Sequence, residues 1–286
     1  VPLPSLLKLD DAGASKNLKV SRCRGLYELQ SRQVNGRPTW RHIMRYDTWL
    51  ACDSSEGIEK WCVNREAELG NVGVAWLMMF GIGNAHPGGR QRTWDWFDRT
   101  KKKWIAEPAV TCEAISEIPP PPQVLLLEGG GPLVPPSVLG YYELSSRQVD
   151  GHPAWQHTVQ RELWIVHTSD YEPPDEDLEA APWAVQKKED LGTDEVELTL
   201  RDLNCLYPSD SKHLWYAYDT KVAESEGVYE GWQPEPTLRC LAMTAEEKVR
   251  REKAAAEEKK RLEKEAEEAR LAQQRAQALA DELIRE

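Results

Sequence analysis

The chain has 286 residues, with twelve tryptophans against two phenylalanines and a formal net charge of −12 at pH 7. This length leaves room for two domains of ordinary size and an extension. The negative charge argues against general affinity for nucleic acid or anionic lipid, because both need a basic surface. No apolar run approaches the ~18 residues of a membrane-spanning helix. We therefore expect no nucleic-acid partner and no transmembrane segment, and peripheral association with a membrane complex stays open.

A repeat organises the sequence. The stretch GLYELQSRQVNGRPTWRH at Gly25–His42 returns 115 residues later as GYYELSSRQVDGHPAWQH at Gly140–His157. A match of this length at a fixed offset indicates a tandem duplication. Five pairs of tryptophans keep the same spacing in both copies: Trp40 with Trp155, Trp49 with Trp164, Trp61 with Trp183, Trp94 with Trp215 and Trp104 with Trp232.

Residues 1–21 are expected to form an N-terminal extension, and residues 22–113 the first β domain. This domain opens with a predicted hairpin, because Asn35-Gly36 tolerates the positive φ of a tight turn and Asp150-Gly151 replaces it in the second copy. Short aromatic runs between turn signals, such as Trp94–Phe97, predict strands rather than helices. We expect each copy to be a small antiparallel domain of five to seven strands.

Residues 114–137 are rich in Pro and Gly and are predicted to be a linker. Four consecutive prolines favour a polyproline II spacer. Val124–Leu127 is apolar enough to dock on a domain as an added strand. The second β domain is expected at 138–242, with acidic insertions around Tyr171–Glu179 and Val222–Glu230 that we predict to be exposed loops.

Residues 243–286 are predicted to form one long charged helix of roughly 60 Å, because neither Gly nor Pro interrupts them. Thr244 and Glu247 have the spacing of a capping box. A thin apolar seam runs along this helix and leaves two interpretations open, a solvated helix held by ion pairs or a helix that docks on a partner as in a coiled coil. The candidate partner-binding residues of the seam are Leu262, Ala269, Ala272, Ala276, Leu279, Leu283 and Ile284.

The paired tryptophans are predicted to fill the domain cores, because a duplicated fold must retain its core positions. The alternative is that exposed indoles stack on sugar rings in a lectin-like site. Trp76 and Trp96 have no tryptophan counterpart in the other copy. These two are therefore the better candidates for contact with a ligand or partner.

No motif in the sequence indicates catalysis, since the nucleophile elbow, the HExxH and CxxC patterns and a phosphate-binding Gly-Lys-Ser/Thr are all missing. His42 and His157 correspond, but no further ligand at suitable spacing is shared, so structural roles are favoured over metal binding. Arg32 and Arg147 are expected to bond within the fold rather than to an anion. We expect no catalytic residue, no cofactor site and no metal site.

Six cysteines are too sparse for a disulfide framework, and the sequence has no Asn-x-Ser/Thr sequon. Reduced, buried thiols in an intracellular or organellar compartment, a plastid included, are favoured over a secreted protein. A Cys23–Cys112 disulfide is the alternative. Because the sequence begins with Val1 rather than Met, any targeting peptide is expected to lie outside it.

The segments Val34–His42 and Val149–His157, together with the later Trp and Glu-Pro positions, resemble a repeat abundant in proteins of marine protists, dinoflagellates included. The resemblance covers about two-thirds of the chain. It implies a duplicated β module used in many contexts and carries no catalytic residue. Chains of this kind also look like lineage-specific accessory subunits of organellar complexes, such as a photosystem.

The sequence thus predicts a mainly β protein, with two tandem homologous small antiparallel β domains and a long C-terminal α-helix. The favoured function is a non-enzymatic scaffold or accessory subunit that binds other protein subunits through its β-domain surfaces and its helix. A carbohydrate-binding module and an enzyme with an unrecognised site are the alternatives.

Overall fold

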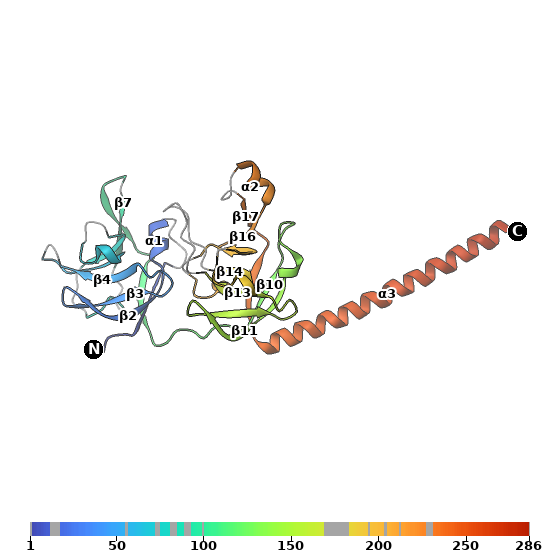
Figure 1. Ribbon diagram of the computed structural model, residues 1–286, viewed down its shortest axis with the longest axis horizontal. Coiled ribbons are helices and arrows are strands. Elements are labelled where there is room, and N and C mark those ends of the chain that lie inside the picture. The colour runs from blue at the N-terminus through green and yellow to red at the C-terminus, as the bar shows by residue number, and fades with distance from the viewer. Residues whose placement is uncertain are drawn as a thin grey trace.

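The computed structural model contains two curled antiparallel sheets followed by one long helix (Figure 1). It confirms the mainly β class, the two similar domains and the C-terminal helix. The structure describes residues 2–11, 18–54, 57–71, 75–80, 85–88, 93–98, 100–168, 183–193, 195–202, 205–211, 213–226 and 231–285.

The first sheet has nine strands in the order β8-β7-β6-β5-β4-β3-β2-β1-β9. β8 and β9 lie at opposite edges of the sheet, although only residues 108–110 join them, so the sheet must curl until its edges approach each other. A short helix, α1 (Leu18–Cys23), precedes β2. The strands are β1 (Leu6–Asp10), β2 (Gly25–Val34), β3 (Arg37–His42), β4 (Thr48–Asp53), β5 (Lys60–Arg65), β6 (Leu77–Phe80), β7 (Trp94–Asp98), β8 (Lys103–Glu107) and β9 (Thr111–Ile115).

The second sheet has the same order, β17-β16-β15-β14-β13-β12-β11-β10-β18, in which each strand corresponds to the strand of the first sheet numbered nine lower. A helix that the first copy lacks among its described residues, α2 (Thr220–Glu226), follows β16, and α3 (Ala245–Arg285) follows β18. The strands are β10 (Val124–Glu128), β11 (Gly140–Val149), β12 (His152–His157), β13 (Leu163–His167), β14 (Trp183–Lys187), β15 (Leu198–Leu200), β16 (Trp215–Tyr218), β17 (Trp232–Glu235) and β18 (Arg239–Met243).

Each sheet has nine strands, more than the expected five to seven. In each sheet, one of the additional strands comes from outside the predicted limits of the domain. β1 lies within the segment 1–21, which was expected to be an extension, but it pairs with both β2 and β9 and buries Leu7 completely. β10 lies within the predicted linker and pairs with β11 and β18 in the same way. The prediction that Val124–Leu127 is an added strand is therefore confirmed, and β1 is its counterpart.

The proline run is fastened to the second domain and is not a free spacer. The indole Nε1 of Trp155 donates to the carbonyl oxygen of Pro122 at 2.7 Å, and the Tyr207 hydroxyl donates to that of Pro119 at 2.5 Å. In the first copy, Trp40 donates in the same way to the carbonyl of Pro4 at 3.0 Å. Each domain thus uses a core tryptophan to hold the chain that enters its first strand.

Two predicted acidic loops have different outcomes. Residues 222–226 of the second insertion are helical, within α2, which corrects the prediction of a loop there. Asp219 accepts hydrogen bonds from the backbone N–H groups of Lys221 and Val222, as a residue preceding a helix commonly does. The other predicted loop, Tyr171–Glu179, lies outside the described residues.

The paired tryptophans form equivalent cores. Four of the five pairs are at most 5 % exposed, and the fifth, Trp104 with Trp232, is half-buried. Trp40 packs edge to face on Trp61 with ring centroids 5.8 Å apart, and Trp155 packs on Trp183 at 5.7 Å. The prediction that these indoles fill the cores is confirmed for the four buried pairs.

Replacing Trp155 by Ala should destabilise the second domain by ~3–5 kcal/mol, because a fully buried aromatic side chain is removed. Trp155→Phe keeps much of the apolar volume but loses the hydrogen bond to Pro122, so it should cost clearly less. Chemical denaturation followed by fluorescence measures both. Equal costs for the two variants would contradict a role of Trp155 as core filler.

The predicted tight turns are present in both copies. Asn35 and Gly36 have φ of 54° and 72°, and Asp150 and Gly151 have φ of 51° and 77°. Positive φ at both central residues is the signature of a type I′ hairpin turn. The hairpins also share a register shift, which falls between Gln30 and Gln33 in the first copy.

In both copies, a histidine at the end of the third strand contacts the residue that precedes the second strand. His42 Nε2 lies 2.7 Å from the carbonyl oxygen of Arg24, while Nδ1 accepts the backbone N–H groups of Met44 and Arg45. Because Nδ1 accepts, Nε2 must carry the proton, and burial lowers the pKa of His42 to about 3. His157 makes the same three contacts in the second copy. These histidines are structural, as predicted.

Gly25 is required beneath His42. Its φ is +133°, and a Cβ atom built on it would lie only 2.2 Å from His42 Nε2. We expect Gly25→Ala to destabilise the first domain by about 3 kcal/mol through strain and steric overlap. Gly36→Ala, also at positive φ but with open space around it, should cost only about 1 kcal/mol. Thermal denaturation of the two variants tests this, and a Gly25→Ala cost no larger than that of Gly36→Ala would disprove it.

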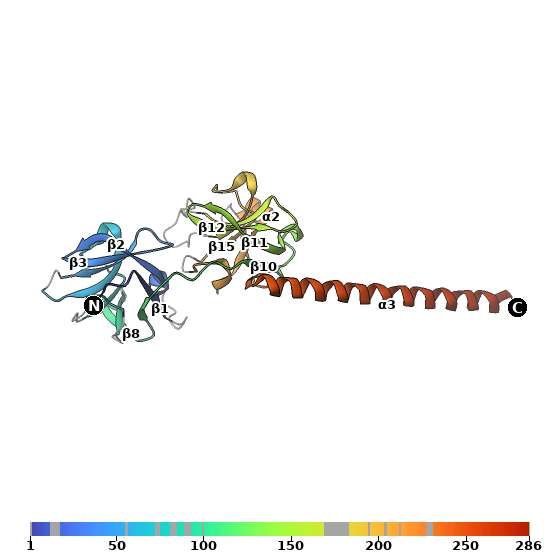
Figure 2. The ribbon, with the colours of Figure 1, turned by 90° about the horizontal axis from the view of Figure 1, so that it is seen from below.

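The helix α3 begins with the predicted capping box, in which Glu247 N–H donates to Thr244 Oγ1 and Thr244 N–H donates to Glu247 Oε2. Its first turns are tied to the second domain by Lys248 with Glu143 at 2.6 Å and Arg251 with Glu128 at 3.5 Å. Beyond them the helix projects away from both β domains (Figures 1 and 2). None of the described helices is long and apolar enough to cross a membrane.

Candidate functional site between the two β domains

The loop after β3 docks the first domain on the second. Met44 is buried within the hydrophobic core cluster of the second domain, and Ile43 packs against the same cluster. In the second copy the equivalent residues are Thr158 and Val159, and Val159 is 76 % exposed. The same corner of the fold is therefore an anchor in one copy and a solvent-exposed loop in the other.

A polar contact and a pair of stacked imidazoles lie beside this anchor. The Tyr46 hydroxyl is 3.0 Å from His152 Nε2, and the His152 ring stacks on His167 with centroids 3.9 Å apart. Trp183 packs edge to face against His167 at 5.4 Å. Both histidines are specific to the second copy, since Arg37 and Cys52 stand at the equivalent positions of the first.

Burial keeps this imidazole pair neutral near pH 7. It lowers the pKa of His167 to about 3, and the charge of His152 would lower it further if both were protonated. Burial also lowers the pKa of His152. Because the unfolded chain binds more protons than the native chain between the ordinary histidine pKa of 6.5 and a pKa of about 3, stability falls as the pH falls through this window.

Between pH 7 and pH 4, the free energy of unfolding of the wild-type second domain should fall by about 3 kcal/mol more than that of the variant His167→Cys. Cysteine is the matched replacement, because Cys52 occupies this position in the first copy. Denaturant unfolding at a series of pH values provides the measurement. Parallel stability-against-pH curves for the two proteins would mean that His167 is not a buried neutral imidazole.

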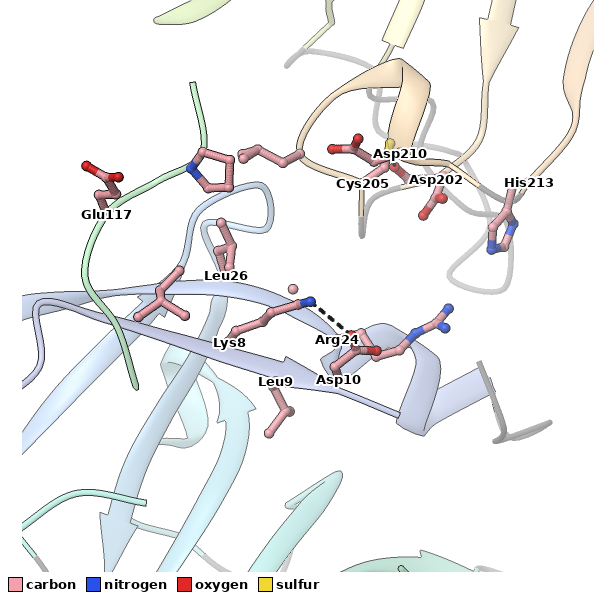
Figure 3. A pocket seen from close by; sticks show the side chains of 14 residues that line it. Lys8, Leu9, Asp10, Arg24, Leu26, Glu117, Asp202, Cys205, Asp210 and His213 are labelled. Atoms are coloured by element: carbon pink, nitrogen blue, oxygen red, sulfur yellow. Dashed lines mark hydrogen bonds and ion pairs between the residues drawn. The ribbon is translucent and has the colours of Figure 1, made fainter. Parts of the chain in front are cut away.

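A cleft of about 410 Å³ lies between the domains. We call it the interdomain cleft, and Figure 3 shows the side chains around it. Lys8 and Arg24 come from the first domain, while Asp202 and Asp210 come from the second and lie on the opposite side (Figure 3). Its lining residues are Lys8, Leu9, Asp10, Arg24, Gly25, Leu26, Ile115, Glu117, Pro119, Asp202, Cys205, Leu206, Asp210 and His213.

Three charged groups of the cleft have partners within their own domain. Lys8 Nζ lies 3.1 Å from Asp10, and Arg24 Nη1 lies 3.0 Å from Asp11, which is completely buried. On the other side, Asp202 Oδ2 accepts a hydrogen bond from the Ser211 hydroxyl at 2.6 Å. These contacts fix the positions of the charges.

Asp210 is the partly desolvated acid of the cleft. Burial raises the pKa of its carboxyl group, and the neighbouring Asp202 raises it further. Hydrogen bonds from the Tyr207 backbone and the Ser209 side chain, together with the charge of Lys8, act in the opposite direction. A cation brought close to Asp210 would therefore restore the stability of its ionised form. The electrostatics of the cleft favour an ammonium group on this side.

The charge of the two domains differs in sign. Residues 1–113 carry 17 basic and 13 acidic side chains, whereas residues 114–244 carry 8 basic and 23 acidic ones. Within the overall charge of −12, the first domain is therefore basic and the second domain is strongly acidic. Their attraction favours the docked arrangement, and it sets up a field across the interdomain cleft.

The two unpaired tryptophans prove to contact the fold itself. Trp76 packs against the first core, with the guanidinium of Arg65 5.7 Å from its ring centroid. At the same positions of the second copy, Glu197 and Lys187 form an ion pair at 3.1 Å. Trp96 is half-buried against the first core. Neither residue lines the interdomain cleft.

The seam residues of α3 lie far along the helix from the cleft. The described side chains of Leu262, Ala269 and Ala272 are exposed. The helix also contains the remaining candidates, whose side chains lie outside the described part: Ala276, Leu279, Leu283 and Ile284.

The predicted roles of the two shared arginines and of the cysteines can be compared with the contacts. Arg32 and Arg147 stack over Trp49 and Trp164, at 5.7 and 5.9 Å from the ring centroids, so both are bonded within the fold. All six cysteines are free and buried, so the alternative of a Cys23–Cys112 disulfide is wrong. Burial raises the pKa of both of these thiols to about 12.

Among the described residues, no group of three or more His, Cys, Asp or Glu could hold a metal ion.

Sequence reasoning missed the interdomain cleft, although a signal was present. Although the lining residue Asp10 corresponds to the acidic Glu128, four other charged residues on its two sides are replaced by uncharged residues in the other copy. These correspondences are Lys8 with Leu126, Arg24 with Leu139, Asp202 with Gly81 and Asp210 with Gly89. A search for charges that differ between the copies would have selected these positions.

No protein-family model matches this chain, and comparison with curated proteins and with solved structures finds no match.

Proposed function

We propose that the protein is a non-enzymatic scaffold or accessory subunit of a larger assembly. In this proposal the two docked β domains form one body, and α3 is an arm that binds a helix of another subunit. The observation that carries it is the exposure of the arm: from Glu252 to Arg275 every described side chain of α3 is exposed to solvent.

The proximal part of the arm is suited to cross solvent. Its ion pairs run along the helix surface, for example Lys259 with Glu263, Arg261 with Glu265 and Lys264 with Glu268. Each such pair contributes only ~0.2–0.5 kcal/mol, but together they support a helix that touches nothing else. This part of α3 acts as a spacer.

The distal part of the arm is less charged and richer in Ala and Leu. From Leu271 to Ile284 the sequence holds a single acidic pair and one Arg, together with eight apolar residues. Most protein helices are stabilised by packing an apolar face on another element. An alanine-rich face allows close approach, so the partner we propose is a helix with its own apolar seam.

The burial of the tryptophans supports a scaffold over a carbohydrate-binding module. Eight of the ten paired indoles are at most 5 % exposed, and a buried indole cannot stack on a sugar ring. The resemblance to accessory subunits supports an organellar complex, such as a photosystem, as the setting. Association with a membrane complex would then be peripheral, through protein contacts.

Deleting residues 262–286 should release the protein from its assembly and leave both β domains folded. Affinity purification at native expression, with mass spectrometry, measures the partners, and circular dichroism of the purified variant measures the fold. A full-length variant with Leu279→Glu and Leu283→Glu should reproduce the loss, because two charges enter the distal seam.

The matched control is Val249→Glu, which places a charge at a 61 % exposed apolar residue near the base of the helix. This variant should keep all partners. If the truncated protein still co-purifies stoichiometrically, α3 is only a solvated rod and the β surfaces carry the docking.

A further inference from the structure

We propose that the interdomain cleft binds a small zwitterion, an α-amino acid or short peptide, whose ammonium group faces Asp202 and Asp210 and whose carboxylate faces Lys8 and Arg24. This site is independent of the arm α3 and of the partner proposed for it. It would give the scaffold a ligand-binding function between its two domains.

The shape and lining of the cleft suit such a ligand. A volume of about 410 Å³ falls in the range of small-molecule sites, which occur preferentially at domain interfaces. Apolar side chains, among them Leu26, Ile115 and Leu206, also contribute to its lining. A compact zwitterion that carries apolar groups beside its two charged groups matches this lining.

The two charged sides specify the ends of the ligand. Arg24 is held by the buried Asp11, so its guanidinium is positioned before a ligand arrives. Lys8 is likewise paired with Asp10, so a ligand carboxylate on this side would share the two cations with Asp10 and Asp11. The guanidinium has five N–H donors and the ammonium three, which allows each cation to bind a second acceptor. On the opposite side two carboxyl groups, Asp202 and Asp210, lie at one edge of an acidic domain. Two neighbouring carboxylates repel each other, and an ammonium group between them removes this cost.

Comparison of the two copies indicates that the fold of the sheet does not require the charges of Lys8 and Arg24. The second copy places Leu126 at the position of Lys8, and there Leu126 is buried in a cluster with Val124 and Met243. Leu139 replaces Arg24 but offers the same carbonyl to its histidine. The sheet therefore forms without a charge at the positions of Lys8 and Arg24, so these two cations can serve the domain interface and a ligand bound in it.

The test uses the full-length chain and a defined panel, the twenty common L-amino acids with Ala-Ala and Leu-Leu. Ligand-observed NMR selects the best binder, and isothermal titration measures its Kd. We expect at least one zwitterion to bind with a Kd below ~1 mM. Its N-acetyl derivative lacks the ammonium group and its methyl ester lacks the carboxylate, so each should bind at least tenfold more weakly.

Variants locate the site. Lys8→Leu installs the residue of the second copy, and Asp210→Asn removes the charge with little change of shape; each should weaken binding at least tenfold. Lys103→Leu and Glu162→Gln, exposed and outside the cleft, are the charge-matched controls and should bind as the wild type does. Thermal unfolding confirms that all four variants fold.

Three outcomes would overturn the proposal: no saturable binding by any panel member up to ~10 mM, equal binding of the capped derivatives, or unchanged affinity in both cleft variants. Asp210→Asn keeps the test decisive if Lys8→Leu fails to fold. Since these readouts do not involve residues 262–286, failure here is distinguishable from failure of the proposed docking through α3.

Discussion

The insertion of Met44 into the core of the second domain is the contact on which the arrangement of this protein depends. A tandem duplication by itself produces two similar domains joined by a chain, and such domains move relative to each other by default. Here Met44 belongs to the hydrophobic cluster of the other domain, and Tyr46 reaches His152 beside it. The anchored loop holds the domains side by side, and the interdomain cleft exists only because they are held.

The same face of the two copies has acquired two different uses. In the first copy, the surface around Lys8 is charged and lines the interdomain cleft. In the second, Leu126 and Tyr141 occupy the corresponding positions of an apolar cluster, and Lys248 at the base of α3 lies 5.7 Å from the Tyr141 ring centroid. Duplication thus provided one surface twice, and divergence assigned one copy to the domain interface and the other to the attachment of the arm.

What the sequence could predict follows from what local chemistry and repetition determine. The turn at Asn35-Gly36 needs positive φ, and the capping box of Thr244 needs a fixed spacing, so both could be identified without a structure. The paired tryptophans were predictable because both copies retain them. β1 was missed, because its match with β10 is limited to two leucines and a final acidic residue within five positions, which is too short to recognise without the strand pairing.

The interdomain cleft could not be predicted for a different reason. Its charged sides are separated by almost two hundred residues, from Lys8 to Asp202, and no local pattern relates them. They meet only because Met44 enters the second core, a contact that depends on the packing of an otherwise ordinary loop. Residues that are the same in both copies indicate what the fold requires, whereas residues that differ indicate how the functions of the two copies diverged. In a duplicated protein, the differences between its own halves are therefore a direct guide to a functional site.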